Sequence, residues 1–179
     1  MTTDAENDFA QRADRLYAAR TALAETQPPR RRFGVAEIVQ FLNDPSRALT
    51  ADEQRSLFTD PRLRADYKRL KALATSFEMP ALAAASSGTI NARRFDGGSI
   101  NIHPSRIAGQ LYVILRFMTT DAAPRALVME STSGELIKRA IPAPDAQGEV
   151  VMVLNENDVA DALFLRLLAD PTSTGTFVQ

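Results

Sequence analysis

Cysteine is absent from this 179-residue sequence, and histidine occurs once, at His103. Without cysteine, the chain forms no disulfide and offers no thiolate nucleophile and no sulfur ligand for zinc or an iron–sulfur cluster. A single histidine also leaves no histidine cluster for a transition metal. We therefore expect neither a metal site nor a cofactor.

Long apolar runs are missing as well. A membrane-spanning helix needs about 20 consecutive apolar residues, whereas the longest apolar runs here, near residues 111–115 and 150–154, have the length of β-strands. The N-terminus carries Asp4, Glu6 and Asp8 and lacks the basic-then-apolar order of a secretory signal. The sequence thus predicts a soluble, cytoplasmic protein that does not act at a membrane.

The sequence also lacks an excess of basic charge. Residues 1–79 contain 13 basic and 12 acidic residues, and residues 80–179 contain 8 and 10. Proteins that bind nucleic acid through phosphate groups carry a basic excess. The aromatic residues, 7% of the chain, also do not alternate with basic ones as a stacking platform for single strands requires. We expect no direct binding of nucleic acid.

Motifs for catalysis are also lacking. His103 lies near Ser105, but Pro104 stands between them and no acidic residue is placed to orient the histidine. The sequence has no EF-hand loop and no glycine-rich phosphate loop, and the Asp-Gly-Gly at residues 96–98 is typical of a tight turn. We therefore expect a protein that is not an enzyme and has no catalytic residue.

An amphipathic helix is predicted over residues 5–26. Phe9, Leu16, Tyr17 and Leu23 recur at helical spacing and form a thin apolar face. Such a face either binds a partner protein in a groove or docks on the rest of the same chain, and both alternatives stay open.

A proline pair follows this helix and ends it. The next residues, Arg30, Arg31 and Arg32, lie in what we interpret as an exposed linker. Three adjacent positive charges in a linker are suited to contact an acidic partner. The predicted partner-binding residues are thus Phe9, Leu16, Tyr17, Leu23, Arg30, Arg31 and Arg32.

Helix signals continue over residues 35–77. Apolar residues at the i, i+3, i+4, i+7 spacing predict a helix over residues 35–43. Thr50 with Glu53 three residues later forms a capping box that begins a second helix reaching Phe58. Asp60 and Pro61 are suited to the cap and first position of a third helix, whose apolar stripe extends to Phe77.

The motifs of this region form a recognisable order: Phe41-Leu42, Ala48-Leu49-Thr50-Ala51-Asp52-Glu53, Phe58, Asp60-Pro61, Leu63 and Leu70. This order resembles the helical domain of anti-sigma factors, in which a Leu-(Ser/Thr)-x-x-Glu turn precedes a helix that begins at Asp-Pro. The resemblance covers about forty residues, and because the His-x-x-x-Cys-x-x-Cys motif is absent, it is to the zinc-free type. It implies a sigma factor as the partner.

From residue 79 to 88 the composition shifts to proline, alanine, serine and glycine, and then the apolar period becomes that of strands. Residues 111–118 are rich in β-branched and aromatic residues, and the continuous apolar run within them predicts a central strand covered on both faces. Residues 158–168 fit both helix and strand, and we favour the helix. Residues 175–178 are interpreted as a last edge strand. The other predicted strands are residues 89–95, 99–103, 127–130, 135–141 and 149–154.

The predicted fold class is α+β. A three- to four-helix module over residues 1–80 and a linker over residues 81–88 precede an antiparallel β-sandwich of about seven strands over residues 89–179. We expect a regulatory or adaptor protein that binds a partner protein through its N-terminal helices, and a homodimer stays open. The alternative is a small-ligand or carbohydrate-binding module accessory to an enzyme encoded nearby, which a pocket with convergent polar groups would favour.

Overall fold

The computed structural model describes residues 33–82, 88–119 and 123–179, which belong to one compact unit, Phe33–Gln179. The helix predicted over residues 5–26 and the arginine linker lie outside the described residues. All seven predicted partner-binding residues, from Phe9 to Arg32, therefore lie outside them too. Most of the linker predicted over residues 81–88 is likewise not described.

Three helices open the described chain: α2 (Val35–Asn43), α3 (Ala51–Thr59) and α4 (Pro61–Ala74). The predicted capping box begins α3, with the Glu53 amide donating to Thr50 Oγ1 at 3.3 Å and the Thr50 amide donating to the Glu53 carboxylate at 2.8 Å. Asp60 accepts from the Arg62 amide at 2.8 Å and caps α4, with Pro61 at the first helical position. Local capping chemistry therefore begins α3 and α4 where the sequence predicts.

The third helix ends earlier than predicted. Its last residue is Ala74, and strand β1 (Thr75–Met79) follows without an intervening loop. The prediction that the helical stripe reaches Phe77 is therefore wrong. The ring of Phe77 instead joins those of Phe95, Phe117 and Phe177, with centroid separations of 5.7, 6.4 and 6.3 Å. The Phe77 ring thus packs in the aromatic cluster, and α4 does not continue for a further turn.

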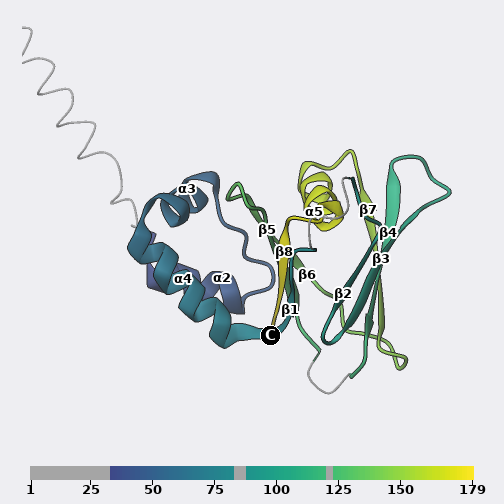
Figure 1. Ribbon diagram of the computed structural model, residues 1–179, viewed down its shortest axis with the longest axis horizontal. Helices are drawn as coiled ribbons and strands as arrows, with labels where there is room; N and C mark the ends of the chain where they lie inside the picture. Colours follow the sequence, from purple (N-terminus) through teal and green to yellow (C-terminus); the bar gives the residue numbers. More distant parts are fainter. Residues whose placement is uncertain (1–32, 83–87, 120–122) are drawn as a thin grey trace, which may run out of the picture. The chain divides into compact units, whose positions relative to one another are not determined.

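Two antiparallel four-stranded sheets form the rest of the unit (Figure 1). One sheet has the order β1-β8-β5-β6, and the other has the order β2-β3-β4-β7. We call them the first and the second sheet. The remaining strands are β2 (Ala92–Phe95), β3 (Gly98–Pro104), β4 (Gln110–Phe117), β5 (Ala126–Glu130), β6 (Leu136–Ala140), β7 (Glu149–Asn155) and β8 (Thr174–Val178).

Strand number and placement differ from the sequence prediction in three respects. The described residues form eight strands rather than about seven, because β1 lies in a segment predicted as helix and boundary. The last strand, β8, is not an edge strand, since it pairs with both β1 and β5. Strand β4 is central but is covered on one face only: Val113 and Leu115 are buried, whereas Tyr112 is exposed.

Strand β5 is the strand that is buried on both faces. Leu127 and Met129 belong to a hydrophobic cluster shared with the second sheet, whereas Ala126 and Val128 belong to a cluster shared with α2, α3 and α4. Figure 1 shows the same arrangement, with the three helices on one side of the first sheet and the second sheet on the other. The helices are thus an integral layer of the fold, because they cover the face of the first sheet that the second sheet leaves open.

The residues for which helix and strand were both open form helix α5 (Val159–Ala169). Asp158 caps it by accepting from the amides of Ala160 and Asp161, both at 3.0 Å. Asp161 in turn pairs with Arg139 of β6 at 2.7 Å, which ties the start of α5 to the first sheet. No helix in the described part of the chain is long and apolar enough to cross a membrane.

Candidate functional site

The outer surface of the helical layer has an apolar groove between α2 and α4. The groove holds about 200 Å³, and its lining is apolar except for one asparagine. Val39 is 37% exposed and Leu73 is 80% exposed, and nearby Val35 is 43% exposed. Large apolar side chains that gather at one exposed site are typical of a binding surface. The lining residues are Val39, Leu42, Asn43, Leu70, Leu73 and Ala74.

One face of helix α4 carries charged residues and ends at Leu73 in the groove. Arg62, Asp66, Arg69 and Leu73 follow the i, i+4, i+7, i+11 spacing and therefore share one face of the helix. Asp66 pairs with Arg69 at 3.3 Å, and Arg62 has no ion-pair partner within residues 33–82, 88–119 and 123–179. Of these charged residues, Arg69 lies one helical turn from Leu73 in the groove, whereas Arg62 lies at the other end of α4.

Two basic residues on another face of α4 form ion pairs with the first sheet. Arg64 and Lys71 both pair with Glu130 at the end of β5, Lys71 at 3.2 Å. The Glu130 side chain is only 12% exposed, so water screens these pairs less than surface pairs. These contacts fix α4 on the first sheet and leave the Arg62 and Leu73 face toward solvent.

Lys138 of β6 anchors α2 in a similar way. Its ammonium group donates to the backbone carbonyls of Phe41 and Asp44 and lies 4.3 Å from the centroid of the Phe41 ring. These carbonyls belong to the last turn and the C-cap of α2, where an intrahelical partner is missing and positive charge is favourable. Burial is the main influence on the ammonium group and lowers the pKa of Lys138 to about 8.

Arg93 is buried and does not form a surface anion patch with Arg94. Its side chain is 3% exposed and donates to the backbone carbonyl of Ser173 at 2.7 Å and to that of Pro80 at 3.1 Å. Arg94, the next residue along β2, is exposed, as strand alternation requires. Arg93 is therefore a structural residue that ties β2 to the segments beside β1 and β8.

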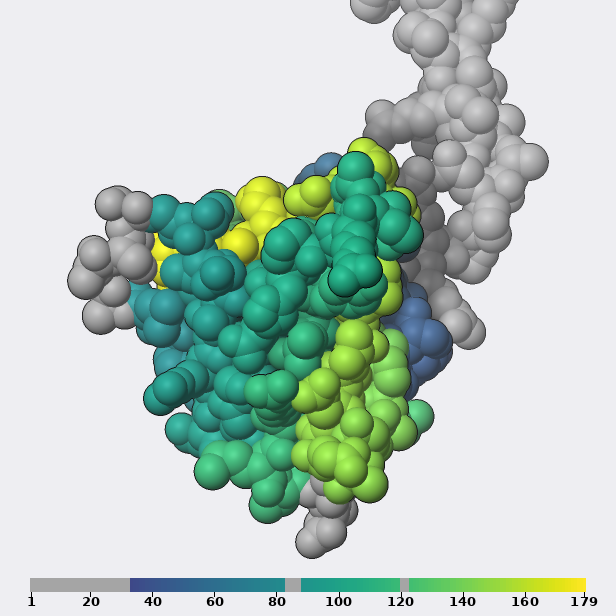
Figure 2. All heavy atoms as spheres, turned by 90° about the vertical axis from the view of Figure 1, so that its right-hand side faces the viewer, coloured from purple at the N-terminus to yellow at the C-terminus, as the bar shows by residue number. Residues whose placement is uncertain are grey.

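The outer face of the second sheet is open to solvent, and Figure 2 looks onto this face. Three apolar or aromatic side chains lie there on the paired strands β4 and β7: Tyr112, 37% exposed, and Val151 and Val153, both more than half exposed. His103 of β3 is opposite Tyr112 in the register and is exposed.

His103 and Ser105 are the residues that a serine–histidine pair would need. Ser105 Oγ accepts from the amide of Ile107 at 3.2 Å, and no hydrogen bond joins it to His103 in the described part of the chain. Within residues 33–82, 88–119 and 123–179, no group of three histidine, cysteine, aspartate or glutamate side chains is placed to hold a metal ion. The groove between α2 and α4 is the described surface closest in the sequence to the predicted partner-binding residues.

Comparisons with known proteins give no relative. No protein-family model matches the chain, and no match is found among curated proteins or solved structures. The resemblance to anti-sigma factors stays a prediction from the sequence, and the groove itself is the basis for assigning a function.

Proposed function

We propose that this chain is a cytoplasmic regulatory or adaptor protein, without enzymatic activity, that binds a partner protein through its N-terminal helices. One observation carries the proposal: the exposed apolar groove between α2 and α4, in which Leu73 is 80% exposed. Within the same proposal, the two sheets act as an antiparallel β-sandwich that supports the helical layer.

The shape and charge of the groove favour an amphipathic helix of the partner as its occupant. A groove between two helices accepts apolar side chains at the i, i+3, i+4 and i+7 positions of a third helix. Arg69, one helical turn from Leu73, favours an acidic residue beside those anchors. Complete burial of one leucine such as Leu73 contributes about 1.5–3 kcal/mol, which makes it the strongest candidate for a central contact.

The resemblance to anti-sigma factors suggests a sigma factor as the partner. Phe9, Leu16, Tyr17 and Leu23, with Arg30, Arg31 and Arg32, are proposed to contribute to the same interaction. Leu16→Glu is the variant that tests this second set, because it places a charge in the middle of the predicted apolar face.

The test begins with purification of the tagged full chain from its native host and identification of stoichiometric proteins. Each candidate is then produced separately, and its affinity is measured with purified proteins. Leu73→Glu should weaken binding at least about tenfold, because it removes an apolar contact and opposes the acidic flank. Met118→Glu is the matched control, since Met118 is an apolar residue that is 79% exposed and does not line the groove.

Two results would contradict the proposal. One is recovery of a clean monomer from the native host with no stoichiometric protein. The other is a partner whose affinity is unchanged by Leu73→Glu and Leu16→Glu. A partner that is sensitive to these variants but is not a sigma factor would retain the protein-binding function and refute the anti-sigma interpretation.

A further inference from the structure

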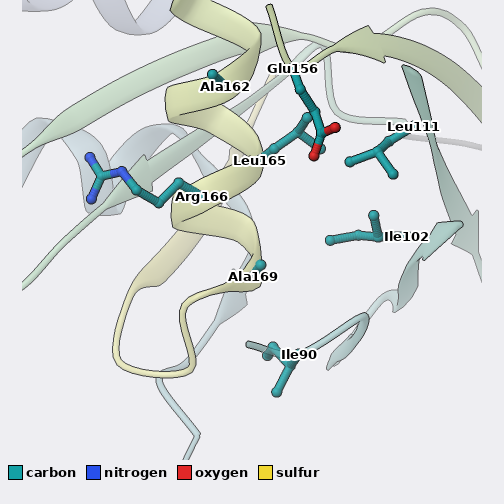
Figure 3. A pocket seen from close by; sticks show the side chains of 8 residues that line it. All are labelled: Ile90, Ile102, Leu111, Glu156, Ala162, Leu165, Arg166 and Ala169. Atoms are coloured by element: carbon teal, nitrogen blue, oxygen red, sulfur yellow. The ribbon is translucent and has the colours of Figure 1, made fainter. Parts of the chain in front are cut away.

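A second pocket lies at the end of the second sheet beneath α5, away from the helical layer (Figure 3). Its volume is about 370 Å³, within the range of roughly 300–1,000 Å³ that small-molecule sites occupy. Most of its lining is aliphatic. The lining residues are Ile90, Ile102, Leu111, Glu156, Ala162, Leu165, Arg166 and Ala169.

Small residues on α5 create this space. Ala162, Leu165, Arg166 and Ala169 follow the i, i+3, i+4, i+7 spacing, so one face of the helix forms one wall. Two of these four residues are alanine, and the helix surface is recessed at both positions. Ile102 and Leu111 form the opposite wall from the inner face of the second sheet, where they pack against the main core. A side chain larger than alanine at either position would fill the pocket.

Backbone hydrogen bonds fix the walls. The Ile90 amide donates to the Ala169 carbonyl at 2.9 Å, and the Ile102 amide donates to the Asn91 carbonyl at 2.8 Å. The Glu156 amide donates to the Gly109 carbonyl at 2.8 Å. The segments that carry Ile90, Ile102 and Glu156 are therefore held in place by the fold, and the pocket is already formed without a ligand.

One carboxylate is directed at this pocket. Figure 3 shows the Glu156 carboxylate between Leu165 and Leu111, two residues that line the pocket. Glu156 has no ion-pair partner in the described part of the chain, whereas Arg166 pairs with Glu135 at 2.6 Å and points away from the pocket. The net charge presented to a ligand is therefore negative, beside an apolar interior.

We propose that this pocket binds a small organic cation, in which an ammonium group is attached to a short aliphatic or aromatic body. The body would occupy the space between Ile102, Leu111 and the two alanines. The ammonium group would donate to the Glu156 carboxylate, and such charge-assisted hydrogen bonds are stronger than neutral ones. This site lies on different elements from the groove between α2 and α4, so it does not depend on the proposed protein-binding function.

The test is a titration of the isotope-labelled full chain with 2-phenylethylamine, followed by amide NMR shifts. Saturable shifts are expected at residues of the pocket such as Ile90, Ile102 and Ala169. The neutral analogue 2-phenylethanol should bind at least about tenfold more weakly, because it keeps the apolar body and loses the charge. The anion 3-phenylpropionate should bind more weakly still, since Glu156 repels it.

Variants separate the two halves of the site. Glu156→Gln should weaken 2-phenylethylamine at least about tenfold and leave 2-phenylethanol unchanged, and because Glu156 is exposed, the variant should fold normally. Ala169→Leu should abolish binding of both compounds by filling the pocket. Glu78→Gln is the charge-matched control, since Glu78 is exposed on β1 and does not line the pocket.

Three outcomes would overturn the proposal. The first is absence of saturable binding of 2-phenylethylamine by the folded full chain. The second is equal binding by the Glu156→Gln variant, which would mean that the carboxylate does not recognise the cation. The third is preferential binding of 3-phenylpropionate, which would assign the pocket to anions through Arg166.

Discussion

Replacement of Arg93 by methionine tests whether a buried guanidinium group holds the two sheets together. The group donates to the Ser173 carbonyl at 2.7 Å, to Ser173 Oγ at 3.0 Å and to the Pro80 carbonyl at 3.1 Å. Methionine keeps an unbranched apolar side chain and removes every N–H donor of the guanidinium group, including the one that contacts the Asp170 carbonyl at 3.4 Å. The acceptors on Ser173 and Pro80 would then lie in a buried site without this partner.

The magnitude follows from opposing terms. A hydrogen bond to a charged group contributes about 1.5–3 kcal/mol, so the two shorter bonds together contribute about 3–6 kcal/mol. Removing the charge also removes the cost of burying it, and this burial lowers the pKa of the Arg93 guanidinium below its ordinary value. We expect a net loss of about 2–4 kcal/mol, a large part of the roughly 5–15 kcal/mol that stabilises a typical domain.

Urea denaturation followed by circular dichroism measures this loss, and an unchanged slope with denaturant would show that the unfolding transition itself is the same. Arg94→Met is the matched control, since it removes the same group from the exposed neighbouring position and should change stability by less than about 0.5 kcal/mol. Arg93→Lys should also be strongly destabilising, because an ammonium group cannot reproduce the planar fork of donors. A stability of Arg93→Met within 0.5 kcal/mol of the wild type, on the order of a surface substitution, would refute the reasoning.

Three further predictions concern single residues. The pKa of Lys138, about 8, lies below its ordinary value of 10.5, so the unfolded chain binds more protons than the folded chain between these two values. The free energy of unfolding of the wild type should therefore rise by roughly 2 kcal/mol relative to that of Lys138→Met between pH 7.5 and 9.5. Equal dependence of the two free energies on pH would refute this. Gly98→Ala should destabilise the fold by more than about 2 kcal/mol, because φ at this residue is +153° and the new Cβ would lie 1.8 Å from the Arg116 carbonyl oxygen. Thermal unfolding measures this loss, and an unfolding midpoint equal to that of the wild type would contradict the prediction. Tyr67→Phe should leave stability unchanged or raise it by about 1 kcal/mol, because the hydroxyl is buried without a hydrogen-bond partner in the described part of the chain. A loss of more than about 1 kcal/mol in urea titration would show that the hydroxyl has a hydrogen-bond partner.

The helix starts were predictable because their causes are local. Thr50 and Asp60 cap α3 and α4 through amides two or three residues away, so a short stretch of sequence contains every group involved. Asp158 begins α5 in the same way. Strand β1 was not predictable on that basis, because Thr75–Met79 follows a helix directly and pairs with β8, almost a hundred residues later.

The candidate sites depend on contacts between distant residues, and the sequence therefore indicated them poorly. Leu73 lies outside the buried stripe of α4, and its significance appears only when α2 is placed beside it. The structural role of Arg93 depends on acceptors at Pro80 and Ser173, and Ser173 is 80 residues away in the sequence. The pocket beneath α5 follows from two alanines on one helix face, a spacing that by itself does not distinguish a recess from close packing.

The double burial of β5 has a consequence for any shorter version of this protein. A fragment that starts at residue 89 would lack β1 and all three helices, and so it would expose Ala126, Val128, Leu136 and Val178 to water. It would also leave β8 as an unpaired edge, which invites association with other chains. The β-rich half therefore depends on the helices for its solubility, and a partner that pulled α2 and α4 away from the sheet would promote aggregation of the chain to which it binds.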